Sequence, residues 1–144
     1  MLTQQEADAL IAAKKELPVG TPAVAIAPGA DETHELAEVG GDERFLLDLS
    51  RGRRRVAKLK FQTRARKVVV LLRLDLDGSP HTNPDGTLLD GTHLHVFREG
   101  YEDKWAYPLD PERFADPLDA PHSFADFCDL SNIASAPILQ ETLL

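Results

Sequence analysis

Alternation of apolar and polar residues is clearest in the middle of the chain, where it predicts a β-hairpin and a buried strand. Every second residue of Arg44–Ser50 is apolar, and the same period of two continues in Val56–Gln62. We expect a tight connection at Arg51-Gly52 to join these two strands. The next stretch, Lys67–Leu76, is almost continuously apolar, which predicts a central strand with both faces covered.

Two helices are predicted near the ends of the chain. Thr3 followed by Glu6 has the spacing of a capping box and predicts a helix over Gln4–Glu16 that covers a sheet. Ser123, with Asp126 three residues later, predicts the start of a second helix. The buried face of this second helix carries Phe124, Phe127 and Cys128.

Shorter strand patterns complete the predicted fold. They lie at Val24–Ala27, His34–Val39, Thr92–Phe97 and Lys104–Leu109. Residues 76–91 are rich in Gly, Pro, Asn and Asp, which predicts turns. The sequence therefore predicts one α+β domain over residues 1–144. We expect a single antiparallel or mixed sheet of about five to seven strands, with an N-terminal and a C-terminal helix packed against it.

Composition places this domain in a reducing compartment. Cys128 is the chain's single cysteine and cannot form an intramolecular disulfide. The N-terminus lacks the basic and continuously apolar segments of a signal peptide, and no run reaches the roughly eighteen apolar residues of a membrane span. We expect a cytoplasmic protein with no membrane partner.

Positive charge is concentrated in one segment, residues 51–67, which we call the basic segment. It carries nine positive charges and no acidic residue, so the rest of the chain has a net charge of −17 within a total of −8. Such a segment can attract RNA or another polyanion even on an acidic protein, because salt screens charges beyond about 8–10 Å. Its cations are Arg51, Arg53, Arg54, Arg55, Lys58, Lys60, Arg64, Arg66 and Lys67.

Side chains suited to proton transfer or phosphate binding gather between positions 73 and 95. His93 and His95 are two residues apart on a predicted strand, which points both to the same face. Arg73 and Asp75 have the same spacing at the end of the preceding strand, and His81 lies between the two pairs. RNA cleavage needs a base for the 2′-hydroxyl, an acid for the leaving oxygen and a cation for the phosphorus-bound charge. Two histidines and an arginine can supply these roles without a cofactor.

Two other interpretations of these residues stay open. His93, His95 and Glu99 have a spacing that resembles the first metal-binding motif of cupins, although the second motif is missing downstream. In the other interpretation, Arg73 and Asp75 form a salt bridge at a strand end, and the histidines are polar residues of a solvated sheet face.

The motifs in this region resemble a bacterial and prophage domain family of unknown function. They are Arg73-x-Asp75, Pro80–Gly86 (PHTNPDG), His93-Leu94-His95, Glu99-Gly100 and Lys104–Leu109 (KWAYPL). A looser resemblance is to TumE-like toxins, ribonucleases that pair with small antitoxins, and it implies catalytic roles for Arg73, Asp75, His81 and His93 or His95. The chain departs from that pattern by a longer turn over Thr82–Thr92 and by lacking doubled histidines.

The leading functional prediction is a toxin-like or phage-encoded, metal-independent ribonuclease, with an antitoxin or a phage or host protein as a partner. A second prediction is a non-catalytic module of prophage origin that binds nucleic acid or protein through the basic segment. The third is a metal-dependent enzyme of cupin-like type.

Overall fold

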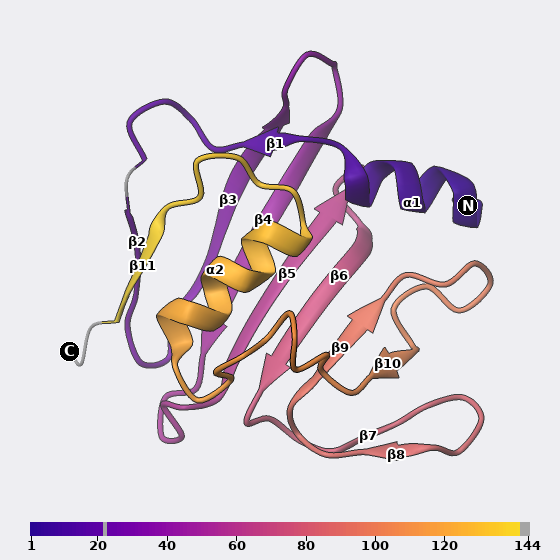
Figure 1. Ribbon diagram of the computed structural model, residues 1–144, viewed down its shortest axis with the longest axis vertical. Helices are drawn as coiled ribbons and strands as arrows, with labels where there is room; N and C mark the ends of the chain where they lie inside the picture. Colours follow the sequence, from indigo (N-terminus) through magenta and orange to yellow (C-terminus); the bar gives the residue numbers. More distant parts are fainter. Residues whose placement is uncertain (22, 142–144) are drawn as a thin grey trace.

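The computed structural model describes residues 1–21 and 23–141 and places them in a twisted seven-stranded sheet with two helices (Figure 1). All pairings within this sheet are antiparallel, as the alternation in the sequence predicts. The fold is α+β. The strand order across the sheet is β1 (Lys15–Glu16), β3 (Asp31–Glu38), β4 (Arg44–Arg51), β5 (Leu59–Ala65), β6 (Val69–Leu76), β9 (His93–Val96) and β10 (Ala106–Tyr107).

In the described part of the chain, four further strands form two small sheets beside the main one. The first small sheet pairs β2 (Ala23–Ile26) with β11 (Ile138–Glu141) in parallel, near the C-terminal end of the described residues. The second pairs β7 (His81–Thr82) with β8 (Leu88–Leu89) in a hairpin beyond the end of β6. The segment predicted only to contain turns therefore includes two short strands.

Helix α1 (Gln4–Ala12) has the predicted capping box, with Thr3 and Glu6 each binding the other's backbone amide. It ends four residues before the predicted Glu16. The backbone turns to an extended conformation at Ala13, and the chain then enters β1. The buried Lys15 ammonium follows this helix end and donates to three backbone carbonyls, which fixes the change of direction.

Helix α2 (Ala120–Leu130) begins earlier than the sequence indicated. Asp119 is its N-cap residue and Pro121 lies in its first turn, where a missing N–H costs nothing. The predicted cap, Ser123, is instead a buried residue inside the helix, and its hydroxyl donates to the carbonyl of Asp116. The predicted start was therefore wrong, because proline at a first helical turn is as strong a signal as serine.

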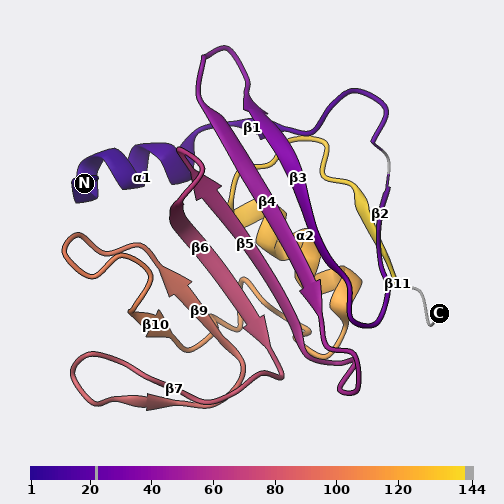
Figure 2. The ribbon, with the colours of Figure 1, turned by 180° about the vertical axis from the view of Figure 1, so that it is seen from behind.

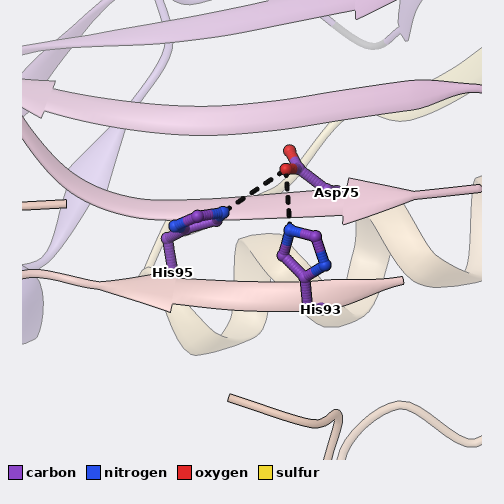
Figure 3. Close-up of side chains that lie close together, drawn as sticks. All are labelled: Asp75, His93 and His95. Carbon is purple, nitrogen blue, oxygen red and sulfur yellow. Dashed lines mark hydrogen bonds and ion pairs between the residues drawn. The ribbon is translucent and has the colours of Figure 1, made fainter. Parts of the chain in front are cut away.

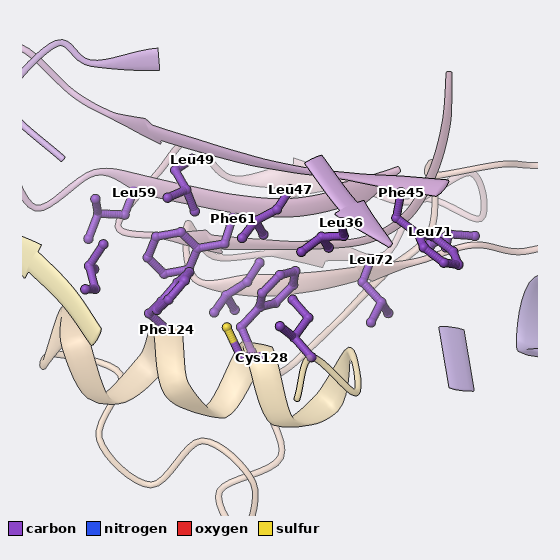
Figure 4. Close-up of a cluster of buried hydrophobic side chains, with 14 of the residues drawn as sticks. Leu36, Phe45, Leu47, Leu49, Leu59, Phe61, Leu71, Leu72, Phe124 and Cys128 are labelled. Atoms are coloured by element: carbon purple, nitrogen blue, oxygen red, sulfur yellow. The ribbon is translucent and has the colours of Figure 1, made fainter. Parts of the chain in front are cut away.

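Helix α2 covers one face of the sheet and creates the main core there (Figure 4). Phe124 and Phe127 pack against Phe61 of β5, with ring centroids 5.2 and 6.2 Å apart. Cys128 is buried in the same layer, and burial raises the pKa of its thiol to about 12. The predicted buried face of this helix is thus confirmed, and Cys128 is an inert core residue.

Among the described residues, no helix covers the opposite face of the sheet (Figure 2), and the side chains that β6 places on that face include polar ones. Strand β6 shows the division best, because Leu72, Leu74 and Leu76 are buried while Arg73 and Asp75 alternate with them. The side chains of Arg73 and Asp75 are only 22% and 15% exposed, so this face of the C-terminal half of β6 is polar but partly covered. Within the described residues, no helix is long and apolar enough to cross a membrane.

The connection between β4 and β5 is also longer than predicted. Strand β4 continues through Arg51, and β5 starts only at Leu59, so residues 52–58 form a loop rather than a tight turn. Strand β5 pairs with β6 so that Lys60 lies opposite Asp75 and Gln62 opposite Arg73. This register extends the polar face toward the loop that carries much of the basic segment.

Candidate active site

Strand register brings the predicted histidines beside the predicted Arg–Asp pair. Strands β6 and β9 are antiparallel neighbours in which Asp75 lies opposite His93 and Arg73 lies opposite His95. Directly opposite residues point to the same side of a sheet, so these four side chains share the polar face. The spacing of two residues predicts that Arg73 and Asp75 share one face of their strand and that His93 and His95 share one face of theirs. It does not predict that the two pairs lie opposite each other.

The fifth predicted residue, His81, reaches the same place from the β7–β8 hairpin. Its ring centroid lies 5.6 Å from that of His93 and 4.6 Å from that of His95. All five side chains line an open cleft of about 490 Å³ on the polar face. Lys58 and Lys60 contribute to the same cleft and give it positive charge near the surface.

Asn83 holds the hairpin in this position, and sequence reasoning assigned it only to a turn. Its buried side chain donates to the carbonyl of Ala106 and accepts from the amide of the same residue, both at 2.9 Å. These two bonds tie the hairpin to β10, the edge strand next to β9. The signal in the sequence was limited to the turn formers around Asn83, which do not indicate a bond over 23 residues.

Asp75 is the central group of the cluster (Figure 3). One of its oxygens, Oδ2, lies 3.0 Å from Nε2 of His93 and 3.4 Å from Nε2 of His95. Its other oxygen, Oδ1, forms an ion pair with Arg73 at 3.4 Å. Burial alone raises the pKa of Asp75, but His95, Arg73 and His93 outweigh it and hold the pKa below its ordinary value. The carboxyl is therefore ionised at neutral pH.

His93 is a buried imidazole whose two nitrogens both face acceptors. Nδ1 lies 2.6 Å from the carbonyl of Asp90, and Nε2 faces the Asp75 carboxylate. A carbonyl can only accept a hydrogen bond, so Nδ1 carries a proton. Nε2 faces the carboxylate as a second acceptor, so both ring nitrogens of His93 are placed to donate.

His95 has the opposite arrangement at Nε2. Its Nδ1 donates to the carbonyl of Asp103 at 2.8 Å, while its Nε2 lies 2.8 Å from Nη2 of Arg73. Because a guanidinium can only donate, Nε2 of His95 accepts from Arg73 when it has no proton, and it faces Oδ2 of Asp75 at 3.4 Å when it has one. Arg73 also donates to the Asp103 carboxylate at 3.2 Å. His95 and Asp103 therefore orient the guanidinium toward the cleft.

His81 is the most solvent-accessible of the three rings. Its Nε2 donates to the carbonyl of Lys104 at 2.9 Å, which leaves Nδ1 with a lone pair when the ring is neutral. The three imidazoles therefore differ in their hydrogen-bond partners, although their ring centroids all lie within 5.6 Å of one another. Backbone carbonyls of Asp90, Asp103 and Lys104 create this difference, and none of them was recognisable from sequence.

A trio of possible metal ligands is also present, but with a different carboxylate from the predicted one. Ligand atoms of Asp75, His93 and His95 all lie within 4.8 Å of one another. The exposed Glu99, predicted as the third ligand, lies in a turn and accepts a hydrogen bond from the backbone amide of Gln4 at 2.7 Å. Glu99 is used to fasten the start of α1 and does not join the two histidines.

The nine cations of the basic segment do not form one continuous face. Arg51 is buried, donates to the carbonyls of Ile26 and Val56, and pairs with Glu141. Arg64 binds Asp48 through two hydrogen bonds of 2.6 and 2.8 Å. Acidic residues from distant parts of the chain therefore neutralise several of the charges. Arg55 pairs with Asp77, and Arg66 pairs with Glu6 and Glu43.

The remaining cations are exposed and fall into two groups. Arg53, Arg54 and Lys58 belong to the β4–β5 loop, and Lys60 follows them at the start of β5. Of these, Lys58 and Lys60 line the cleft directly. Lys67 is exposed in the turn between β5 and β6, at the other end of those strands. The structure thus places only the N-terminal part of the basic segment beside the candidate site.

Comparison with known protein families identifies a family for this chain. The model of a family of unknown function, DUF6978, matches residues 2–133 and so covers nearly the whole chain. No curated protein and no solved structure matches the chain.

Proposed function

Since the chain belongs to DUF6978, a family to which no function is assigned, we propose its function from the site itself: metal-independent cleavage of RNA. The observation that carries this proposal is the difference in hydrogen-bond partners between two adjacent rings. His81 has a backbone carbonyl at Nε2, so its Nδ1 is available as the base. His93 has an acceptor at each nitrogen and is placed to carry a second proton against Asp75, with ring centroids 5.6 Å apart. A neutral and a cationic imidazole in one cleft form an acid–base pair.

In the proposed reaction, the RNA 2′-oxygen attacks the adjacent phosphorus and the bond from phosphorus to the 5′-oxygen breaks. Nδ1 of His81 accepts the proton of the 2′-hydroxyl, and Nε2 of His93 gives its proton to the departing 5′-oxygen. The products are a 2′,3′-cyclic phosphate and a 5′-hydroxyl end, so atoms and protons balance. Exchange of protons with water then returns both rings to their starting states.

Arg73 is assigned the stabilisation of negative charge on the phosphorane. Its guanidinium lines the cleft and is held by His95 and Asp103, so it needs little reorganisation when charge develops. Asp75 is a positioning residue that keeps the second proton on His93. Lys58 and Lys60 are exposed on the same cleft and would contact flanking phosphates of the strand.

The substrate class follows from the chemistry, because only RNA supplies a 2′-hydroxyl as an internal nucleophile. A toxin role with an antitoxin partner is the biological setting we propose, as the resemblance to TumE-like toxins implies. Binding of nucleic acid without cleavage is the competing proposal. It predicts that replacing the histidines leaves function unchanged.

The first test is a cleavage assay on purified protein and its variants with a labelled single-stranded RNA. We expect His81→Gln and Arg73→Gln each to reduce the cleavage rate by about a hundredfold or more, the usual contribution of a general acid–base group or a charge-stabilising donor. His122→Gln is the matched control, because His122 is exposed on α2, outside the cleft.

RNA binding, measured on the same proteins, separates catalysis from attachment. We expect His81→Gln to bind RNA as tightly as the unmodified protein while losing cleavage. Absence of RNA cleavage by the unmodified protein would contradict the proposal. Equal rates for the His81→Gln and His122→Gln variants would contradict it as well.

A further inference from the structure

We infer that Asp75, His93 and His95 bind a divalent transition-metal ion of the Zn²⁺ class, and that the bound ion inhibits the proposed cleavage. The site is built on two neighbouring strands, with Asp75 on β6 directly opposite His93 on β9. Metal binding stands independently of the cleavage reaction. Only the inhibitory consequence rests on the proposed function.

Two of the spacings between the ligand atoms suit a metal coordination sphere, and all three atoms lie within 4.8 Å of one another. Tetrahedral ligands that bind Zn²⁺ at about 2.0–2.1 Å lie about 3.3 Å from one another. Here Oδ2 of Asp75 is 3.0 Å from Nε2 of His93 and 3.4 Å from Nε2 of His95. Two imidazoles and a carboxylate are a ligand set used by catalytic zinc and by other divalent transition metals.

The rings are oriented as metal-binding imidazoles require. Each has Nδ1 bonded to a backbone carbonyl, of Asp90 for His93 and of Asp103 for His95, so that Nε2 points toward Asp75. Metal-ligating histidines nearly always donate their second ring N–H in this way, which fixes the ring and the tautomer. Both side chains are only 1% exposed, so the ring positions are set before any ligand arrives.

Asp75 also has bonding capacity left over. Its buried Oδ1 accepts no hydrogen bond from the described residues and has only the ion pair with Arg73, at 3.4 Å. On His95, the Nε2 lone pair needed by a metal is taken by Arg73 at 2.8 Å. Arg73 has Asp103 as an alternative partner at 3.2 Å, so it can leave His95 without becoming a buried, unpaired charge.

Binding and cleavage therefore compete for the same atoms. A metal on Nε2 of His93 replaces the proton that the proposed reaction gives to the leaving oxygen. The same metal on His95 removes one of the two groups that hold Arg73. We consequently expect an occupied site to be inactive toward RNA.

The experiment is a titration of the intact, tag-free protein with Co²⁺, followed by visible absorption, and with Zn²⁺, followed by calorimetry. We expect one equivalent of either ion to bind. Asp75→Asn and His93→Gln should each weaken binding at least about tenfold, because each removes a ligand. Circular dichroism of each variant shows whether it is folded.

Arg73→Ala gives the most discriminating result, because it should affect the two functions in opposite directions. Removing the guanidinium frees Nε2 of His95 and takes a positive charge away from the metal, so we expect tighter Co²⁺ binding. The same change should abolish cleavage. His122→Gln controls for surface binding, since Nε2 of His122 lies 3.5 Å from Asp126.

The metal site would be overturned by an absence of Co²⁺ and Zn²⁺ binding to the folded protein. Binding that is lost in His122→Gln but kept in Asp75→Asn would overturn it too. Full RNA cleavage by protein saturated with Zn²⁺ would overturn the inhibitory role. A protein that binds Zn²⁺ at Asp75 but never cleaves RNA contradicts the proposed function and supports the metal site.

Discussion

Backbone carbonyls decide which imidazole nitrogen carries a proton in the cleft. Asp90, Asp103 and Lys104 each present a carbonyl to one ring, and a carbonyl accepts only. The role of the other ring nitrogen depends on the group that it faces. This is the Asp75 carboxylate for His93, the Arg73 guanidinium for His95 and the cleft for His81. The three histidines therefore acquire three different chemical roles from their immediate neighbours.

Lys15 is a second case in which neighbours determine the state of a titratable residue. It is fully buried, donates to the carbonyls of Ile11, Ala13 and Ser131, and lies over the ring of Phe45. Burial lowers its pKa to about 8, against a smaller raising effect of Glu38. Between about pH 8 and the unfolded value near 10.5, the unfolded chain holds a proton that the folded chain has lost.

This difference predicts a pH-dependent stability. Stability rises with pH when the unfolded state binds more protons, so the free energy of unfolding should gain up to about 3 kcal/mol from Lys15 between pH 8 and 10.5. Urea unfolding of the protein and of Lys15→Met, compared at both pH values, isolates this contribution. A stability difference between the two proteins that does not change with pH would show that Lys15 titrates normally.

At the scale of elements, the site depends on one hairpin placed by side-chain bonds. The β7–β8 hairpin carries His81, and its attachment to β10 includes both hydrogen bonds of the buried Asn83. The strands β6 and β9, by contrast, are held by their own ladder. The geometry of His93 and Asp75 is thus robust, whereas the position of His81 relies on Asn83.

Asn83→Ala should therefore affect activity more than the fold of the sheet. It leaves the buried amide and carbonyl of Ala106 without side-chain partners, at a cost of about 1–3 kcal/mol. We expect lower stability in denaturant unfolding, loss of RNA cleavage and retained Zn²⁺ binding at Asp75. Pro84→Ala, exposed in the same turn, is the control and should leave all three unchanged.

The elements show which features a single sequence can predict. Strands β4, β6 and β9 and helix α1 follow from local alternation and capping, which are properties of adjacent residues. Four of the five candidate side chains follow from spacing on β6 and β9, whereas His81 was predicted only from its place in the turns between those strands. The hydrogen bonds between Asn83 and Ala106 join residues that are far apart in the sequence. The partners of the histidines are backbone carbonyls, which every residue type has. No pattern of residues in the sequence therefore predicts either feature.

At the scale of the whole molecule, charge is distributed differently in space and in sequence. The basic segment has no acidic residue within it, yet Arg51, Arg64 and Arg66 pair with acidic residues from other parts of the chain, which are Glu141, Asp48 and Glu43. These pairings depend on tertiary structure, which is why a count of charges along the chain overestimated the basic surface. Of the basic segment's exposed cations, Lys58 and Lys60 line the cleft and contribute positive charge to it.

The most direct test of metal-independent proton transfer is the identity of the products formed from RNA in the presence of a chelator. We expect the protein to cleave RNA without added metal and to leave 2′,3′-cyclic phosphate ends. We also expect the matching all-deoxy strand to stay intact and His81→Gln to form product at least about a hundredfold more slowly. Cleavage of both strands, or cleavage that requires added metal, would contradict the assignment of proton transfer to His81 and His93.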